Sequence, residues 1–515
     1  MRTREEILML RETRTENGAV RGLPGTDARI TVYKGIPYAA PPVGKNRWRA
    51  PQPVEDWDGV RECYTFGPIN MQRTPGADPE AFYSREWHVD PAVPMGEDSL
   101  YLNIWTPAKH PEEKLPVMVW IFGGGFQEGY SYEMEFDGER IASRVVILVS
   151  ISYRLNAFGF LAHPDLTAED PEHPTNFGLL DQLCAFQWVK RNIGFFGGNP
   201  ENITIFGQSA GGDAVYAHLC SPRSRGAFQK AIVQSNGAFT YYYPKTFLSR
   251  IRPTLPEAEE KGVRFLKDWL GVDTIEEARK LDAALIEQKQ LEMNLFAIPT
   301  VDGKFLMDDM PRSVIKNEMN DVPFLIGNTT GEFMYGPDGE TEEEILAWAN
   351  DNFGIRGQEY FDIVRREAEQ RGKSLREAAS ISSFELGAQL AVETMARNGR
   401  NPWYYRFGPT VPGDDAGAYH SCDLWFEFET LIRCWRPFDG HHFDLARRMC
   451  NYWTNFAKTG DPNGTDPAGL PMPEWKPYTL QKKNEIRFFD EITVSAEQSE
   501  KRRFLIDINI QGNAE

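Results

Sequence analysis

Short runs of apolar residues alternate with segments of helical periodicity along much of this chain of 515 residues. The run at 145–152 is typical of a central strand, and after it Leu179, Leu183 and Phe186 recur at helical spacing on one stripe. This alternation predicts an α/β fold, with a large, mostly parallel central sheet covered by helices on both faces. Other runs with strand character lie at 115–122, 202–206, 322–327 and 403–407.

The region from about 250 to 400 differs, because it is rich in both charge and helical period. We expect helices over 257–270, 274–291 and 374–398, and Pro256 suits the start of the first. No low-complexity run, internal repeat or linker-like stretch separates this region from the rest. The sequence therefore predicts one domain over residues 1–515 that carries helical insertions around 250–400.

The run at 202–206 leads into Gly207-Gln208-Ser209-Ala210-Gly211, and a segment of helical character follows. A G-x-S-x-G motif between a strand and a helix is typical of a nucleophile elbow. In such a turn the serine takes a strained backbone conformation, and the glycines keep neighbouring side chains away. The helix N-terminus then faces any developing negative charge. The motif alone also fits an ordinary glycine-rich turn, so its partners decide the interpretation.

A serine nucleophile needs a base and an acid that orients the base, and in this fold class the chain order is serine, acid, histidine. Only His420, His441 and His442 follow Ser209 by more than a helix length. His420 lies in a glycine-containing loop after the run 403–407, where a base is expected. We interpret His441 and His442 as solvent-facing polar residues, since no further Cys or His stands near them at metal-ligand spacing.

The acid and the oxyanion donors are expected after two other strands. Glu332 follows the run 322–327 closely, although many acidic residues compete with it on position alone. Gly123, Gly124 and Gly125 follow the run 115–122 directly. Bare amides at that place are able to approach a substrate closely and hold an oxyanion. A flexible turn is the alternative interpretation of the three glycines.

These motifs stand within longer blocks, through which the chain resembles the type-B carboxylesterase family, a group of α/β-hydrolases that includes carboxylesterases, cholinesterases and lipases. The resemblance runs from about Thr15 to about Tyr478. Its most specific blocks are 35–44 (GIPYAAPPVG), 97–107 (EDSLYLNIWTP), 176–182 (NFGLLDQ), 196–200 (FGGNP) and 453–463 (WTNFAKTGDPN).

The resemblance implies a catalytic triad of Ser209, Glu332 and His420, which removes the ambiguity over the acid. The implied activity is two-step hydrolysis of carboxylic esters with short to medium acyl chains, through an acyl-enzyme on Ser209. It implies neither a metal nor a cofactor, and the partner is a small-molecule ester. The predicted helices between nucleophile and base would cap the active site.

The resemblance also implies supporting residues around the triad. The oxyanion donors would be the amides of Gly124, Gly125 and Ala210. Ser235 matches a serine that hydrogen-bonds near the acid in relatives, and Gln208 stands beside the nucleophile. The acyl pocket would be lined by Met293 and Leu295, although plain core packing explains these two residues equally well.

Departures from the family pattern narrow the activity. Gln208 stands where cholinesterases carry a glutamate, which weakens a cholinesterase-like interpretation. A lipase is a second alternative within the family. Relatives that act as adhesion proteins have lost the nucleophile, whereas all three triad residues stand here, so a purely binding role is disfavoured. Ser99 replaces the cysteine that would pair with Cys63, so we expect Cys63 to be a free thiol.

Composition adds limits on partners and compartment. The net charge of −19 argues against nucleic acid, whose phosphates would be repelled. No apolar run approaches the roughly 20 residues of a membrane span. Six cysteines in so long a chain do not suggest a disulfide framework. Together with Ser99 they predict a cytoplasmic protein, with a secreted protein whose leader is lacking from this sequence as the alternative. The oligomeric state is left open.

Overall fold

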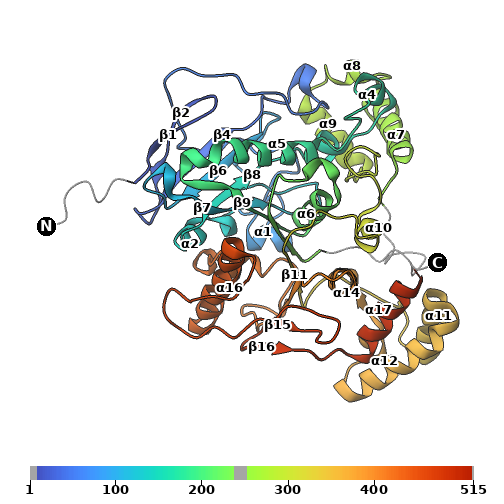
Figure 1. The fold of residues 1–515 in the computed structure, drawn as a ribbon. Coiled ribbons are helices and arrows are strands. Elements are labelled where there is room, and N and C mark those ends of the chain that lie inside the picture. The colour runs from blue at the N-terminus through green and yellow to red at the C-terminus, as the bar shows by residue number, and fades with distance from the viewer. Residues whose placement is uncertain (1–8, 237–251, 513–515) are drawn as a thin grey trace.

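A computed structural model describes residues 9–236 and 252–512 of the chain, with a large central sheet as its main feature (Figure 1). The sheet has 11 strands in the order β16-β15-β14-β11-β10-β9-β7-β8-β6-β4-β3, while β1-β2-β5 and β12-β13 form small separate sheets. The strands are β1 (Glu12–Thr15), β2 (Gly18–Arg21), β3 (Leu23–Pro24), β4 (Thr31–Pro37), β5 (Val60–Glu62), β6 (Tyr101–Thr106), β7 (Leu115–Ile121), β8 (Ile147–Ile151), β9 (Gly198–Gln208), β10 (Lys230–Gln234), β11 (Phe324–Thr329), β12 (Met334–Tyr335), β13 (Ile381–Ser382), β14 (Trp403–Phe407), β15 (Glu485–Phe488) and β16 (Ile492–Ser495).

The middle of the large sheet is parallel and its edges are antiparallel. From β8 through β7, β9, β10, β11 and β14 to β15, each strand pairs in parallel with the next. β16 at one edge and β6, β4 and β3 at the other pair antiparallel. Strands β8, β10 and β11 are buried along their whole length, which explains their continuous apolar character. Because parallel strands end at one edge of a sheet, the loops after β7, β9, β11 and β14 meet there.

Helices cover both faces of this sheet, as predicted. α5 and α6 pack together over β9, and α16 packs with α2 and α15 against β7 and β9 from the other side (Figure 1). The helices are α1 (Phe82–Glu86), α2 (Glu139–Ala142), α3 (Asn156–Phe160), α4 (Pro164–Glu169), α5 (Phe177–Asn192), α6 (Ala210–Cys220), α7 (Leu255–Arg264), α8 (Ile275–Ala278), α9 (Ala283–Met293), α10 (Met310–Ile315), α11 (Glu342–Phe353), α12 (Gly357–Arg371), α13 (Leu375–Ala379), α14 (Ser383–Arg397), α15 (Leu424–Glu427), α16 (Gly440–Thr459) and α17 (Glu500–Gly512).

Two of the three helices predicted between 250 and 400 are interrupted. The prediction for 257–270 is confirmed, because α7 continues into a π-helical segment, Phe265–Leu270. The prediction of continuous helices over 274–291 and 374–398 is wrong, since the first divides into α8 and α9 and the second into α13, β13 and α14. Asp282 and Ser382 accept hydrogen bonds from the amides of Ala284 and Glu385 and so start new helices.

The insertion region does not form a single cap. Helix α9 and the first residues of α14 reach the cavity described below, whereas no residue of α11 or α12 lines it. Instead α11 and α12 pack with α13, α14 and α17 around a second small core that includes Ile345, Phe353, Tyr360 and Phe504. Only part of the region around 250–400 is therefore placed to shape the entrance of that cavity.

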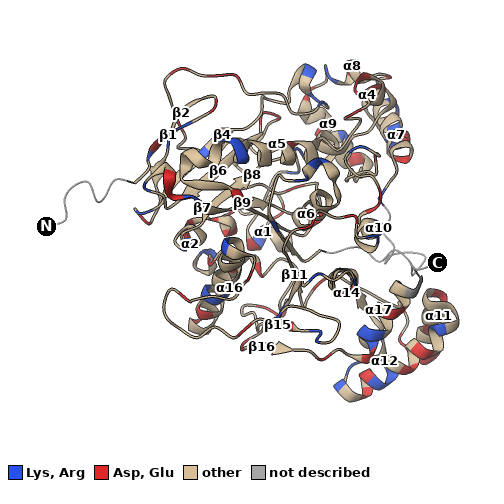
Figure 2. Cartoon of the chain, viewed as in Figure 1, with Lys and Arg blue, Asp and Glu red and all other residues tan. Residues whose placement is uncertain are grey.

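Several predictions from composition can be compared with the structure. All six cysteines lie within the described residues and are free thiols, which confirms the prediction for Cys63. Ser99, at the expected partner position, donates a hydrogen bond to Asn70 Oδ1 over 2.6 Å. In the described part of the chain, no helix is both long and apolar enough to cross a membrane. Helices such as α12 carry interspersed acidic and basic residues (Figure 2).

Candidate active site

Ser209 lies on a sharp turn between the end of β9 and the start of α6. Its backbone has φ +55° and ψ −124°, a strained conformation for a residue with a side chain. The turn is held on both sides, because the Ser209 amide donates to Gln234 O over 2.9 Å and the Asp213 amide donates to Ser209 O over 2.9 Å. The Asn236 side chain donates to Ser209 O as well, over 3.0 Å.

Both glycines of the motif are required by close backbone packing. A Cβ at Gly207 would lie 2.5 Å from backbone atoms of Gly211, and one at Gly211 would lie 2.0 Å from Ile121 O. Neither neighbour is a flexible side chain that moves aside. The sequence G-x-S-x-G therefore lets β9, α6 and the end of β7 approach one another closely enough to present Ser209.

A histidine and a glutamate complete a chain of hydrogen bonds to this serine. His420 Nε2 lies 2.9 Å from Ser209 Oγ, and His420 Nδ1 lies 2.5 Å from Glu332 Oε2. Because the Glu332 carboxylate only accepts, Nδ1 carries the proton and Nε2 is left to accept from the serine hydroxyl. His420 and Glu332 are 5% and 4% exposed, so solvent competes little for these bonds.

The glutamate is fixed before any substrate arrives. Its other oxygen, Oε1, accepts from the amide and the hydroxyl of Thr329, each over 3.0 Å. Behind it lies the buried Asp423, to which the Tyr405 hydroxyl donates over 3.0 Å. Burial, followed by the charge of Glu332, raises the pKa of Asp423 to about 7. Below that pH a neutral Asp423 spares Glu332 a second buried negative charge.

The loop after β7 brings bare amides next to the serine. Gly124 and Gly125 have φ of +95° and +64°, in the region that favours glycine. Gly124 O accepts from the amides of Gln127 and Glu128, over 2.9 and 3.1 Å, which closes the loop. Among the described residues, the amides of Gly124 and Gly125 donate to no protein acceptor. Ala210, as the first residue of α6, also has an amide without an acceptor within its helix.

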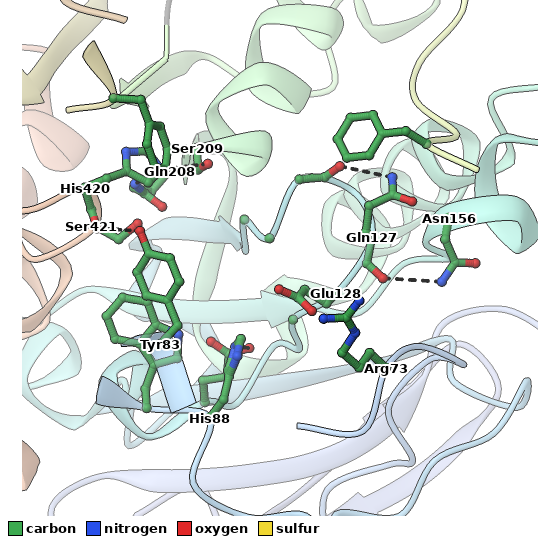
Figure 3. Close-up of a pocket in the computed structure, with 18 of the residues that line it drawn as sticks. Arg73, Tyr83, His88, Gln127, Glu128, Asn156, Gln208, Ser209, His420 and Ser421 are labelled. Atoms are coloured by element: carbon green, nitrogen blue, oxygen red, sulfur yellow. Dashed lines mark hydrogen bonds and ion pairs between the residues drawn. The ribbon is translucent and has the colours of Figure 1, made fainter. Parts of the chain in front are cut away.

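These groups open into a cavity of about 560 Å³. Ser209, His420 and Gln208 lie at one side of it, with Tyr83 and His88 below them and Gln127, Asn156 and Arg73 across from them (Figure 3). The mouth carries large apolar side chains that are 44–49% exposed, namely Leu291, Phe296, Phe333 and Tyr335. The cavity is therefore apolar at its rim and has the serine and the glycine loop in its wall.

The supporting residues named by the resemblance differ in placement. The Gln208 amide lies 3.3 Å from His420 Nε2, beside the serine. Ser235 is buried, but its hydroxyl has no hydrogen-bond partner among the described residues, so the expected hydrogen bond near the acid is not seen. Leu295 lines the cavity, whereas Met293 does not and packs against the main core.

His441 and His442 lie away from the cavity, at the first turn of α16. The prediction that both face solvent is wrong for His442, which is 4% exposed and bonds Thr410 O through Nε2 over 2.8 Å. The reason is helical spacing, since Asp439 caps the helix and places His442 on its inner face. His441 is exposed, as predicted. Asp439, His441 and His442 come within 4.8 Å of one another at this cap.

Sequence reasoning missed the acidic side chains of the cavity. Glu128, Glu133, Glu135 and Glu287 all line it, and Glu133 and Glu135 are 4% and 0% exposed. Their only sequence signal is the unusual alternation of acidic and large residues at 132–136 (YEMEF), directly downstream of the glycine loop. Nothing in that pattern shows that the carboxyls turn inward rather than to solvent.

A parallel sheet that presents a serine on a strained strand-to-helix turn, bonded to a histidine and through it to a glutamate, defines a serine hydrolase of the α/β-hydrolase class. The profile of the Carboxylesterase family matches residues 10–353 and 353–504. The chain therefore belongs to the carboxylesterase family and is a serine carboxylester hydrolase.

Several relatives match over most of their length. The chain is 32% identical to the para-nitrobenzyl esterase of Bacillus subtilis (strain 168) over 513 residues, which cover 95% of this chain and 97% of that protein. It is also 32% identical to the acetylcholinesterase of Bungarus fasciatus over 502 residues, covering 91% and 81%. Among solved structures, a carboxylesterase of Geobacillus stearothermophilus has a TM-score of 0.75 and 30% identity, covering 96% of this chain and 99% of that one.

Proposed function

We propose that Ser209, His420 and Glu332 are the catalytic triad of this carboxylesterase. The observation that carries the proposal is the unbroken chain of hydrogen bonds from Ser209 Oγ through His420 to Glu332, on a strained elbow at the edge of the cavity. In the first step Ser209 Oγ bonds to the ester carbonyl carbon, and its proton passes to His420 Nε2. Glu332 holds the ring and stabilises the imidazolium that forms.

The tetrahedral intermediate then loses the alcohol. Its oxyanion is held by the amides of Gly124, Gly125 and Ala210, for which the described part of the chain offers no other acceptor. The bond to the leaving oxygen breaks as His420 returns the proton to it, which leaves an acyl group on Ser209. Water then repeats both steps, with His420 as base and then acid, and releases the carboxylic acid.

The acyl group is proposed to be short to medium in length. The cavity of about 560 Å³ is open at an apolar rim, with Leu295 in its wall, so it accepts flexible chains without a long closed tunnel. Gln208, a neutral side chain, stands beside the nucleophile. A cholinesterase-like activity is therefore disfavoured, although the identity to an acetylcholinesterase equals that to the para-nitrobenzyl esterase.

A panel of 4-nitrophenyl esters of increasing acyl length tests this function. The purified protein should hydrolyse the acetate, butanoate and hexanoate, with lower kcat/KM for long chains. Ser209→Ala should abolish hydrolysis while its melting temperature stays near that of the parent. Ser143→Ala, at an exposed serine, is the matched control and should behave like the parent. Substantial hydrolysis by a folded Ser209→Ala protein would refute the assignment.

We also propose that the protein works in a reducing compartment such as the cytoplasm. What supports this is the set of six free thiols, four of them buried, together with Ser99 at the position where relatives pair a cysteine with Cys63. Alkylation of the unreduced, denatured protein followed by mass spectrometry should modify all six cysteines. Recovery of a Cys63 disulfide from protein purified from its native source would contradict the proposal.

A further inference from the structure

The wall of the active-site cavity holds more acidic groups than the proposed chemistry uses. Four glutamates line it, and the single arginine, Arg73, is exposed. Glu133 and Glu135 are the most buried of the four, at 4% and 0% exposure, and both lie on the segment that follows the glycine loop. None of these glutamates bonds to Ser209, His420 or Glu332 in the described part of the chain.

Only one of the two carboxyl oxygens of Glu133 accepts hydrogen bonds from the described residues. Its Oε1 accepts from the Tyr130 amide over 2.9 Å and lies 3.2 Å from His88 Nε2. Burial lowers the pKa of His88, but the charge of Glu133 and its hydrogen bond outweigh burial, with a further contribution from Glu128, so the pKa is raised. Its other oxygen, Oε2, receives no hydrogen bond from the described residues.

Glu135 has no donor in the described part of the chain. Neither of its carboxyl oxygens has a hydrogen-bond partner among the described residues, although the side chain is completely buried. Burial, and then the charge of Glu133, raise the pKa of Glu135 well above its ordinary value. The fold therefore favours the protonated form of Glu135. Glu287, on α9, adds a third buried carboxyl, whose Oε1 has no partner among the described residues.

An adjacent pair of buried carboxyls with too few donors is costly unless a partner supplies them. A metal ion is not favoured as that partner, because the one group of three or more potential ligand residues close enough together in the described chain is Asp439, His441 and His442. A second anion is excluded by charge. A protonated amine fits, because its N–H groups donate to the unpartnered carboxyl oxygens and its positive charge favours their ionised form.

We propose that Glu133 and Glu135 form a cation subsite that receives an N–H-bearing ammonium group of the ester substrate. Glu133 contacts the ammonium directly, and Glu135 adds a second buried carboxyl that has no donor among the described residues. The cavity then binds the rest of the ester between this subsite and Ser209 (Figure 3). The proposal rests on the proposed esterase function, since it names the substrate class for the same cavity.

Three matched esters test the acyl side of this proposal. They are the 4-nitrophenyl esters of 6-dimethylaminohexanoic acid, of its trimethylammonium analogue, and of its uncharged carbon isostere, 7-methyloctanoic acid. For the parent protein, kcat/KM for the dimethylammonium ester should exceed that for the isostere by about tenfold or more, the effect of one or two charge-assisted hydrogen bonds. The trimethylammonium ester, which lacks an N–H, should lose most of this advantage.

Two variants and one control locate the effect. In Glu133→Gln and Glu135→Gln the ratio of kcat/KM for the dimethylammonium ester to that for the isostere should fall to near unity. Glu292→Gln makes the same change on an exposed residue of α9 outside the cavity and should keep the parent ratio. A ratio that survives in both cavity variants would overturn the subsite, as would equal rates for the dimethylammonium ester and the isostere in the parent.

The amine belongs to either the acyl or the alcohol part of the ester, and a second pair of substrates distinguishes these. 6-Dimethylaminohexyl butanoate is compared with 7-methyloctyl butanoate by pH-stat titration. A preference for the amine in either series supports the subsite, and its absence from both refutes it.

If a cavity variant does not fold, inhibition of the parent by hexyldimethylammonium, but not by its carbon isostere, supports the subsite in its place. Failure of the parent to hydrolyse the uncharged esters would instead refute the esterase function.

Discussion

Glu332 and Glu135 are two buried glutamates of one active-site region, yet the protein treats them in opposite ways. Glu332 accepts from the amide and hydroxyl of Thr329 and from His420, so its carboxylate is complete without substrate. Glu135 has no donor among the described residues, and burial followed by the charge of Glu133 raises its pKa. A carboxylate whose donors come from the protein is fixed in place for catalysis, whereas one without donors is completed by a ligand.

Glu332 and Glu135 also have different roles in the site. Glu332 holds the proton-transfer chain in one geometry, which lowers the barrier of the chemical step. Glu135 offers carboxyl oxygens without donors among the described residues, which select among substrates rather than accelerate the reaction. Variants of Glu332 should therefore lower turnover and variants of Glu135 should change substrate preference, while the two should change stability in opposite directions.

The largest effect on turnover is expected for Glu332→Gln, which changes the glutamate whose donors come from the protein. The glutamine amide favours the wrong tautomer of His420, so kcat for 4-nitrophenyl butanoate should fall about a thousandfold to ten-thousandfold. Steady-state kinetics with Glu292→Gln as control measure this, and the control should keep the parent kcat. A loss of less than about tenfold would show that Glu332 does not orient the base.

The next largest effect on turnover is expected for the amides of the glycine loop, which are proposed to hold the oxyanion. Gly125→Val should lower kcat about a hundredfold, because valine does not adopt the φ of +64° that aims the amide, and a lost oxyanion donor costs about 2.7–4 kcal/mol. Steric crowding plays little part, since a Cβ at Gly125 meets only the Phe296 ring at 3.7 Å.

Gly271→Val is the matched control for this variant. Gly271 has φ +70°, and a Cβ there meets nothing within 4 Å, so the same strain is introduced at a residue that does not line the cavity. Thermal unfolding of both variants shows whether their folds are equally affected. If Gly125→Val kept normal turnover while melting like Gly271→Val, the oxyanion would have to be held elsewhere.

The smallest effect, on stability, distinguishes the two glutamates directly. Glu135→Leu should stabilise the fold by about 1–3 kcal/mol, because it removes a buried polar group that has no donor. Glu332→Leu should instead destabilise it, because it leaves the Thr329 and His420 donors unpaired.

The stabilisation by Glu135→Leu should depend on pH. The pKa of Glu135 is raised in the folded state, so the folded protein keeps a proton that the unfolded chain loses. Parent stability contributed by this group is present below its ordinary pKa of 4.5 and is lost as pH rises through the folded value. Denaturant unfolding should therefore show a larger gain for Glu135→Leu at pH 8 than at pH 5, and a loss of stability at both would contradict the account.

Most of the proposed catalytic site could be predicted from the sequence, because its geometry depends on local backbone requirements. Close approach at Gly207 and Gly211 and the positive φ at Gly124 and Gly125 demand glycine, and these demands leave motifs at fixed spacing. Glu332 was one acidic residue among many until the family resemblance singled it out. The parallel sheet could be predicted for a similar reason, since fully buried strands such as β8 and β11 give continuous apolar runs.

What the sequence did not show depends on long-range packing. The interruption of the predicted helices at Asp282 and Ser382 comes from side-chain caps that compete with a periodic pattern. His442 reads as a surface residue but turns inward to Thr410. The inward direction of Glu133 and Glu135 is set by the tertiary fold around the cavity, and acidic residues in a loop ordinarily indicate a solvated surface.

The central claim, that Ser209 is the nucleophile of a triad completed by the protein itself, is tested most directly by fluorophosphonate labelling. The parent protein should gain one adduct by intact mass, peptide mapping should place it on Ser209, and Ser209→Ala should remain unlabelled. Glu332→Gln should be labelled at the same serine but far more slowly, because its base is wrongly oriented. An adduct on another residue, or labelling of folded Ser209→Ala at the parent rate, would contradict the account.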